Sequence, residues 1–458
     1  MGFTRLEFPI FLALVIALVW ATRRVTLRNA ILLAASYYFY AYWDYRFCGL
    51  LILSTVVDFI AARQIDRSQS QGIRRLFLLT SLCVNLGVLG FFKYYNFFIE
   101  SLAEVWGHWG WGSQTLQIIL PVGISFYTFQ TLSYTIDVYR RKLRATSNFL
   151  NFALYVAFFP QLVAGPIVRA KELLPQLAVR PTFSKRRMYG GFQQLLRGAV
   201  KKILIADRMG EAVDVVFAGP DLYSTVTLWI AVVAYAGQIY YDFSGYTDMA
   251  TGAAKMMGYR FPPNFRHPYL SSNMAQFWRR WHMTLSRWLR DYLYIPLGGN
   301  RLGRSRTYVN LMITMTLGGL WHGAAWTFVL WGVWHGLGLA VHRMSTTRIR
   351  LSRGVGWGLT TMVVLAGWVL FRSPDLASAM SILGRMSWPT EGIYWFPPLP
   401  LLMIGVMVIE HACWAAGWRR PRRLPADRWY SPVVTAILLW SLVLYAPQGF
   451  RPFVYFQF

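Results

Sequence analysis

The sequence VNLMITMTLGGLWHGAAWTFVLWGVWHGLGLAV, residues 309–341, contains no aspartate, glutamate, lysine or arginine. About 20 predominantly apolar residues are enough for an α-helix to cross the hydrocarbon core of a bilayer. This run is longer than that, so it predicts membrane-embedded structure. Because backbone polar groups in lipid must be hydrogen-bonded internally, the expected structure is helical.

Further apolar runs of varying length follow one another along the 458-residue chain. They cover residues 8–20, 76–92, 118–134, 149–168, 226–241, 357–371, 399–418 and 433–445. Some are long enough to span a bilayer, and others are short enough to be tilted or re-entrant. The sequence therefore predicts an all-α, polytopic integral membrane protein with roughly 9–12 membrane helices plus interfacial and re-entrant helices. No long polar linker divides the sequence, which favours a single membrane domain over residues 1–458.

The composition and the charge distribution agree with a membrane protein. Charged residues make up 14% of the chain, whereas about 25% is usual in soluble domains. The formal net charge of +27 comes from lysines and arginines that gather between the apolar runs, for example in residues 169–187 and 279–306. This arrangement is typical of cytoplasmic loops of membrane proteins. Anionic membrane lipid therefore explains the positive charge better than nucleic acid does.

Several kinds of catalytic or cofactor site lack their usual sequence motifs. The sequence has no serine-hydrolase elbow, no phosphate-binding loop, no dinucleotide fingerprint and no helical pair of zinc-binding histidines. The three cysteines, Cys48, Cys83 and Cys413, lie in or beside apolar runs without metal-ligand spacing. Histidine is therefore the main catalytic candidate, and we predict neither a metal ion nor a permanently bound cofactor.

Residues 259–308 differ from the rest of the chain because they are aromatic, strongly basic and interrupted by prolines. Such a segment is too polar to cross a bilayer plainly, so it lies at the interface or folds back into the protein. Within it, Trp278, His282 and Leu285 recur at helical spacing on one face, and Arg280 and Arg287 lie largely on the other. An interfacial amphipathic helix explains the arginines, but not an ionisable histidine on the aromatic face.

His322 is the strongest catalytic candidate from the residues alone. It lies inside the longest apolar run, with Gly318, Gly319 and Gly323 around it. Polar groups inside membrane segments are costly and are often functional, and a neutral imidazole can accept the proton of a hydroxyl as a general base. The alternative is a hydrogen-bonded core residue. His335 points away from His322 on a continuous helix, so the two converge only if the helix breaks.

Two carboxylates occur in the sequence YYDFSGYTD, residues 240–248, which has the composition of a turn between helices. Asp242 and Asp248 have the chemistry to orient a histidine or an arginine. Their spacing does not decide between these partners.

The sequence FWRRWHMTLSRWLRDYLYIPLGGN, residues 277–300, closely resembles a signature of the membrane-bound O-acyltransferase family. It is most similar to the bacterial branch that serves alginate O-acetylation and the D-alanylation of teichoic acids. Other matching pieces are residues 121–130, 159–168, 241–248, 319–323 and 452–458. The resemblance extends from about the first apolar run to the last residue.

This resemblance implies a ring of tilted helices around a central tunnel that crosses the membrane. The family's near-invariant histidine falls on His322, and its second position falls on His282. Acyl transfer from a thioester to a hydroxyl needs a base and a group that stabilises the oxyanion. We therefore expect His322 to be the base and His282 to orient it or stabilise the developing charge. Phosphates of the donor are expected to bind arginines, namely Arg279, Arg280, Arg287 and Arg290, although lipid headgroups are an alternative partner for them.

The resemblance also implies a function. We expect a multi-pass protein of the bacterial inner membrane that takes acetyl from a cytoplasmic thioester, acetyl-CoA, and delivers it outward for O-acetylation of an exported polysaccharide such as alginate. Periplasmic acetyltransferase proteins are the expected partners. The alternatives are transfer of D-alanyl or another acyl group, acetylation of cellulose or another exopolysaccharide, a non-catalytic scaffold, and a transporter. Transporters often have repeated halves, which this sequence does not show.

Overall fold

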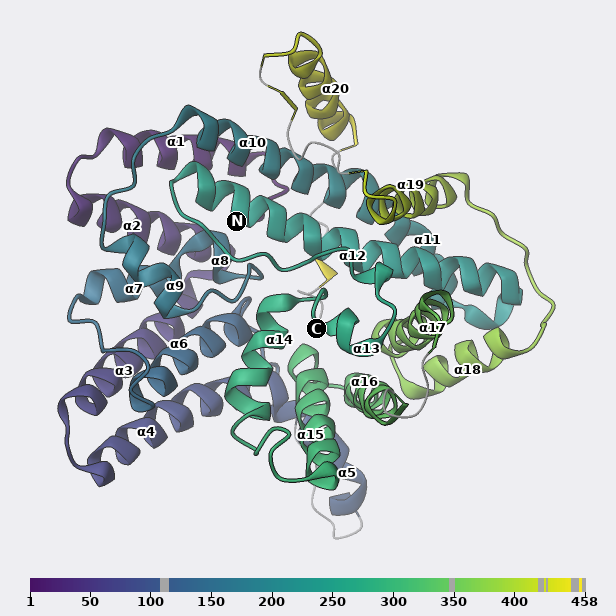
Figure 1. Cartoon of the computed structure of the whole chain (residues 1–458), viewed down its shortest axis with the longest axis horizontal. Helices are drawn as coiled ribbons and strands as arrows, with labels where there is room; N and C mark the ends of the chain where they lie inside the picture. Colours follow the sequence, from purple (N-terminus) through teal and green to yellow (C-terminus); the bar gives the residue numbers. More distant parts are fainter. Residues whose placement is uncertain (108–114, 346–350, 419–423, 426, 446–452, 455–458) are drawn as a thin grey trace. The chain divides into compact units, whose positions relative to one another are not determined.

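The computed structural model describes residues 1–458 except 108–114, 346–350, 419–423, 426, 446–452 and 455–458. Within the described residues the regular structure is helical, and the only strand-like pairing is an isolated bridge between Tyr223 and Ile393. The predicted all-α class is therefore confirmed (Figure 1). The physical reason is that a helix forms hydrogen bonds between its own backbone N–H and C=O groups, which lipid around an apolar run cannot provide.

The helices form two compact units, of which the first contains Met1–Leu195 and Met249–Pro262 and the second contains Leu196–Asp248 and Pro263–Phe458. The long helix α12 (Thr225–Met256) contributes residues to both. Compact units in a static structure do not show that either part folds alone. The single domain expected from the sequence therefore stays a prediction.

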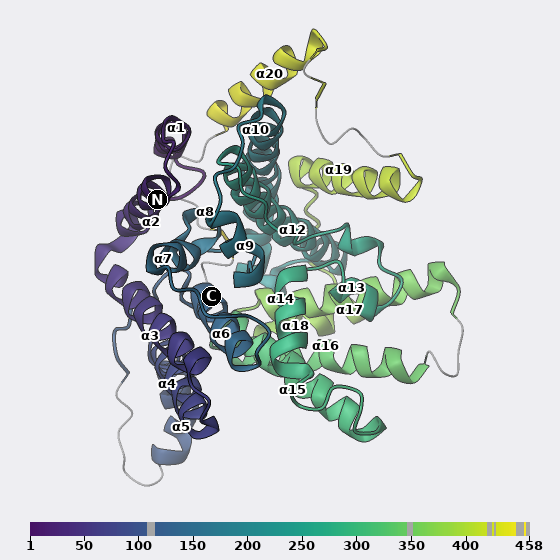
Figure 2. The same cartoon turned by 60° about the vertical axis from the view of Figure 1, so that its left-hand side comes forward.

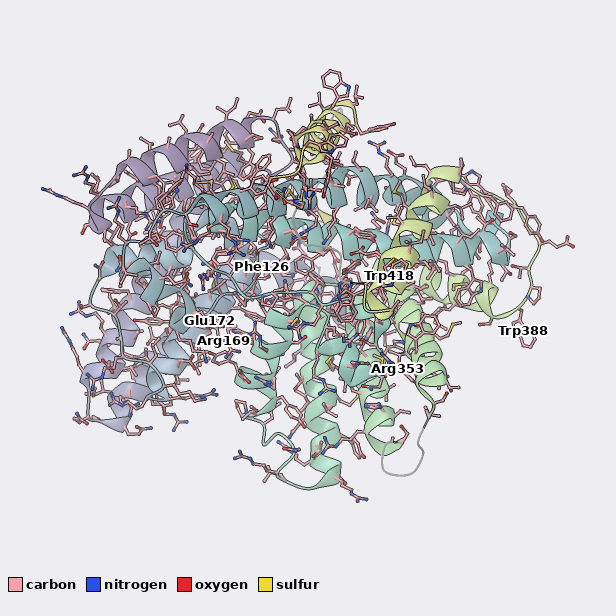
Figure 3. All side chains as sticks on the ribbon, turned by 45° about the horizontal axis from the view of Figure 1, so that its top comes forward. Phe126, Arg169, Glu172, Arg353, Trp388 and Trp418 are labelled. Carbon is pink, nitrogen blue, oxygen red and sulfur yellow. The ribbon has the colours of Figure 1, made fainter. Side chains whose placement is uncertain are left out.

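Four stretches among the described residues are long and apolar enough to cross a membrane. They are Val25–Arg67, Gln71–Ala103, Arg353–Arg372 and Pro398–Ala415. The third of these stretches begins and ends with an arginine, as expected where a helix meets the membrane surface. Figure 3 labels the arginine at its start, Arg353. The chain is a polytopic helical membrane protein. The larger number of membrane helices expected from the sequence stays a prediction, because the other described helices are shorter or less hydrophobic.

The first unit is built around α6 (Ile124–Tyr139), nearly all of whose side chains are buried. This helix packs against α3 (Cys48–Arg67), α4 (Gln71–Leu89) and α7 (Phe149–Ala157) (Figures 1 and 2). The other elements of this unit are α1 (Glu7–Ala21), α2 (Val25–Asp44), η1 (Tyr45–Phe47), η2 (Gly90–Tyr94), α5 (Tyr95–Gly107), α8 (Phe159–Leu162), α9 (Ala170–Leu177) and most of α10 (Lys185–Ala199).

The second unit has an aromatic core that contains the fully buried side chains of Trp281, Trp331 and Trp368. Trp281 comes from the basic segment, between two of its short helices, whereas Trp331 and Trp368 come from two longer helices, α16 (Trp326–Ser345) and α17 (Arg353–Arg372). The other elements are η3 (Val200–Ala206), α11 (Asp207–Ala218), η4 (Pro220–Leu222), η5 (Pro268–Leu270), α13 (Met274–Trp278), α14 (Met283–Leu289), η6 (Arg290–Tyr294), α15 (Arg304–His322), α18 (Leu376–Ser387), α19 (Pro398–Ala415) and α20 (Tyr430–Leu444).

The long apolar run at residues 309–341 is not one helix. It breaks after His322 and forms a hairpin of α15 and α16. The two backbones touch at glycines: a Cβ atom on Gly319 would lie 2.2 Å from the Phe328 carbonyl oxygen, and one on Gly332 would lie 2.4 Å from that of Met315. Small residues allow this close approach of helices in a membrane.

We expect replacement of Gly319 by alanine to destabilise the protein by about 1–3 kcal/mol, the usual cost of overpacking a well-packed core. The added methyl group meets backbone atoms of α16, which cannot rotate away. Thermal unfolding of the purified protein measures the effect. Gly338→Ala is the matched control, because its Cβ atom would have ordinary contacts of 3.4 Å. Equal unfolding temperatures for the two variants would contradict the prediction.

Candidate active site

His282 lies at a break between two short helices. The preceding helix α13 ends at Trp278, α14 begins at Met283, and His282 has a φ of +38°. The continuous amphipathic helix predicted over this part of the basic segment is therefore wrong. A positive φ is uncommon for a residue other than glycine, so the surrounding contacts must hold it.

Those contacts come from the chain that precedes the break. The Arg266 amide donates a hydrogen bond to the Arg280 carbonyl (3.0 Å), and the Met283 amide donates one to the Asn264 carbonyl (2.9 Å). The Asn264 side-chain oxygen accepts hydrogen bonds from the amide (3.1 Å) and hydroxyl (3.0 Å) of Thr284. Backbone groups that would otherwise continue a helix are satisfied here by tertiary contacts, which explains why the helical pattern in the sequence does not persist.

His322 is the last residue of α15, and its side chain is only 5% exposed. Its ring contacts those of Trp331 (centroids 5.1 Å apart) and Phe371 (5.3 Å). The break in the long apolar run is thus what directs His322 into the aromatic core.

The two predicted histidines come together within the second unit. The ring centroids of His282 and His322 are 6.4 Å apart, and Trp321 contacts both rings, at 6.1 and 5.0 Å. Phe243 covers His282 from α12 with a centroid distance of 4.6 Å. His282, which lies outside the four candidate spans, is fully buried, and this burial lowers its pKa to about 3. A histidine of this kind is neutral at physiological pH.

His335 is a third buried histidine in the same core. Its ring centroid lies 4.7 Å from that of Trp331 and 5.3 Å from that of Trp278. Trp331 thus contacts both His322 and His335. The helix break allows both histidines to contact the side chain of Trp331. His335 is nevertheless a residue of the aromatic core and not part of the candidate site.

The four arginines predicted for donor binding all lie in the basic segment, on both sides of the break at His282. Arg290 forms an ion pair with Asp291 (2.7 Å). Burial lowers the pKa of the Arg280 guanidinium, and neighbouring cations lower it further; these neighbours are Arg353, Arg266 and Arg279. Arg280 also lies over the ring of Trp414, whereas the Nε atoms of Arg279 and Arg287 donate to backbone carbonyls one helical turn earlier. The positive charge therefore gathers around Arg280.

The carboxylates expected in a turn lie instead inside α12, so that prediction is wrong. Gly245 has a packing role there, because a Cβ atom on it would lie 2.8 Å from the Gly198 carbonyl oxygen. Asp248 pairs with Lys201 (2.8 Å) and Arg197 (3.3 Å). Asp242 pairs with Lys202 (2.6 Å), and so its partner is neither a histidine nor an arginine.

The sequence interpretation missed the group of residues that surrounds Lys202. This lysine is buried and pairs with both Asp207 (2.8 Å) and Asp242. The other oxygen of Asp242 accepts a hydrogen bond from the Val454 amide (2.9 Å), and the Phe453 ring lies 4.7 Å from the Lys202 ammonium. Charged residues at hydrophobic positions were the available signal, but only the fold brings positions 202, 242 and 454 together.

Among the described residues, no group of three or more histidine, cysteine, aspartate or glutamate side chains is placed to hold a metal ion.

Comparison with known proteins agrees with this architecture. Residues 140–371 match the model of the membrane-bound O-acyltransferase family. A protein of Pseudomonas putida described as a probable alginate O-acetylase is 38% identical to this chain, and the alignment covers 94% of each sequence. The peptidoglycan O-acetyltransferase of Helicobacter pylori is 38% identical over 78% of this chain and 73% of its own length. The teichoic acid D-alanyltransferase of Streptococcus thermophilus is more distant, at 29% identity over 50% and 58%. The chain belongs to the membrane-bound O-acyltransferase family and is an O-acyltransferase.

Proposed function

We propose that this protein is an inner-membrane O-acetyltransferase that accepts acetyl from a cytoplasmic thioester and passes it outward for O-acetylation of an exported polysaccharide, with alginate as the first candidate. The observation that carries the proposal is the pair of enclosed histidines 6.4 Å apart in a chain similar over nearly its whole length to a probable alginate O-acetylase.

The chemistry of acyl transfer assigns His322 as the general base. Its imidazole removes the proton from the accepting hydroxyl, whose oxygen attacks the thioester carbonyl. The carbon–sulfur bond then breaks, and the thiolate takes up the proton and leaves as a thiol. A neutral base in a low-dielectric site suits this reaction, because no charge has to be desolvated before the proton moves.

In this proposal His282 stabilises the reacting group or orients His322. Its neutral ring can donate one hydrogen bond to the oxyanion of the tetrahedral intermediate. Both histidines are fixed by packing, since the His282 backbone is constrained by Asn264 and the His322 ring lies among Trp331 and Phe371. Such preorganisation lowers the cost of reaching the transition state.

Acetyl-CoA is the donor that we propose, as a substrate rather than a bound cofactor. Its phosphates suit the positive charge around Arg280, to which Arg266, Arg279 and Arg353 contribute. Guanidinium groups bind phosphate by paired hydrogen bonds. Arg287 and Arg290 are further candidates for the same role. Periplasmic acetyltransferase proteins would complete the transfer to the polysaccharide.

The test is transfer from labelled acetyl-CoA by the purified protein in liposomes, together with the acetyl content of the polysaccharide exported by a deletion strain that carries the gene on a plasmid. Label transfer and restored acetyl content are the expected results. Transfer of D-alanyl without acetyl would overturn the acetyl assignment. Normal acetyl content in the deletion strain would favour a scaffold or a transporter.

Peptidoglycan is the second candidate acceptor, because the relative in Helicobacter pylori carries that activity in its name at the same identity as the alginate relative. Separate analysis of acetyl esters in alginate, cellulose and peptidoglycan fractions distinguishes these acceptors.

We expect His282→Ala to lower acetyl transfer by about 10²- to 10³-fold, the effect of removing one hydrogen-bond donor to an oxyanion. Transfer from labelled acetyl-CoA is measured at equal amounts of inserted protein. His282→Gln is the matched variant, since its amide still offers a hydrogen-bond donor, and it should retain more activity than the alanine variant. Full activity in His282→Ala would remove this residue from the site.

A further inference from the structure

Large apolar side chains are exposed on the segment that connects α17 and α19 in the second unit. Trp388, Ile393, Tyr394 and Phe396 are each more than half exposed, and Figure 3 labels the first of them. Single exposed apolar residues are ordinary on a protein surface, whereas several of them close together mark a surface that binds a protein or a membrane. We call residues 388–396 the aromatic loop.

Hydrogen bonds to η4 and to the start of α12 hold the backbone of the aromatic loop in place. The Ile393 amide donates to the Leu222 carbonyl (2.8 Å), and the Ile393 carbonyl accepts a hydrogen bond from the Ser224 amide (3.2 Å). The Thr227 hydroxyl accepts another from the Trp395 amide (2.9 Å). A fixed backbone presents the aromatic side chains in defined positions, so little conformational entropy is lost when they bind.

The segment between α17 and α19 carries little charge. Its charged residues are Asp375, Arg385 and Glu391. The Arg385 guanidinium donates to the carbonyls of Tyr223 (2.8 Å) and Glu391 (3.2 Å), so it stabilises the backbone of the loop. The exposed surface therefore suits an apolar or amphipathic partner better than a strongly charged one.

The segment begins and ends at candidate membrane spans. These spans are Arg353–Arg372 and Pro398–Ala415, so Phe396 lies directly before the second of them. Arginines gather at the other end of each span, with four in residues 343–353 and five in residues 418–428. The positive-inside rule makes these ends cytoplasmic. The aromatic loop therefore lies at the opposite surface of the membrane.

The surface of α19 continues the surface of the aromatic loop. Only 17% of the apolar window of this helix is buried, and Leu402, Val408 and Ile409 are exposed along it. Lipid is the solvent that such a helix face requires in a membrane protein. An exposed tryptophan, Trp418, follows the helix at its cytoplasmic end (Figure 3). Aromatic side chains at both ends are typical of a helix that spans the bilayer, because their rings lie at the level of the headgroups.

We propose that the aromatic loop is an interfacial anchor that inserts Trp388, Tyr394 and Phe396 among the lipid headgroups at the membrane surface opposite the cytoplasm. The partner is the bilayer, because the loop continues the lipid-facing surface of α19 and carries little charge. Through its hydrogen bonds the anchor fixes the depth of the start of α12 as well as that of α19. The inference does not depend on the acyl-transfer chemistry.

The test measures the depth of nitroxide labels on the full-length protein in phosphatidylcholine liposomes that contain no other protein. The labels are attached to Trp388→Cys and Tyr394→Cys, after the three native cysteines have been replaced by serine. Power-saturation EPR compares the collisions of each label with oxygen, which partitions into lipid, and with a water-soluble nickel chelate. At both positions we expect oxygen to be favoured over the chelate.

Two further labelled variants provide the references. Leu402→Cys reports the lipid core, because Leu402 is exposed within the candidate span. Glu391→Cys reports water, because Glu391 is an exposed charged residue of the same loop, and charge avoids the membrane interior. The ratio of oxygen to chelate collisions at positions 388 and 394 should lie severalfold above that at Glu391 and below that at Leu402. A ratio at either position equal to that at Glu391 would overturn the proposal and would favour a protein as the partner of the loop.

Discussion

Replacement of His322 by alanine is expected to reduce acetyl transfer by about 10²- to 10⁴-fold, the range that a positioned general base contributes. The variant loses the only group assigned to take the proton from the accepting hydroxyl. Neither Trp331 nor Phe371, whose rings contact His322, can replace it as a base. Transfer from labelled acetyl-CoA and the acetyl content of the exported polysaccharide measure the effect, with the amount of inserted protein determined by blotting.

His335→Gln is the matched control for this experiment. His335 is at least as buried as His322 and contacts the same tryptophan, but it has no assigned role in proton transfer. We expect its replacement to change activity by much less than that of His322. An inserted His322→Ala protein with full activity would remove His322 from the mechanism. Equal losses in the two variants would indicate damage to the aromatic core instead.

Replacement of Asp242 by alanine is expected to destabilise the protein by about 3 kcal/mol, near the lower end of the cost of breaking a buried ion pair. The variant removes the 2.6 Å contact with the buried Lys202 and the hydrogen bond from the Val454 amide. Asp207 remains as a second partner of Lys202, which limits the loss. Denaturant or thermal unfolding of the purified protein measures the change in stability.

Asp248→Ala provides the comparison, because it lies on the same helix but pairs with two more accessible cations. The side chains of Lys201 and Arg197 are 15% and 38% exposed, compared with 3% for Lys202. A more accessible ion pair contributes less than a buried one, so this variant should lose less stability than Asp242→Ala. Equal destabilisation of the two variants would mean that burial of Lys202 does not determine the cost.

The local chemistry of the sequence was sufficient to predict the class of protein. Long uncharged runs predict helices in a membrane because the transfer free energy of each side chain and the need to satisfy the backbone act locally. The same reasoning selected His322, since an ionisable residue in such a run is costly. His282 stood out on the aromatic face of a helical pattern that the structure interrupts, and its assignment to the site came from the family resemblance.

Tertiary structure decided where the helices break and which polar groups meet. The sequence pattern continues through His282, but Asn264 and Arg266 provide hydrogen bonds that end the helix there. Residues 240–248 have the composition of a turn, yet they lie inside α12, where Gly245 allows the close approach of a neighbouring backbone.

The sequence by itself thus determined a helical membrane protein with a buried histidine as its main catalytic candidate. Only the tertiary structure brought His282 to within 6.4 Å of His322 and gave Asp242 its lysine. The physical reason is that hydrophobic transfer is a property of each segment, whereas a hydrogen bond or an ion pair requires a partner. That partner can lie far away in the sequence, and no local pattern identifies it.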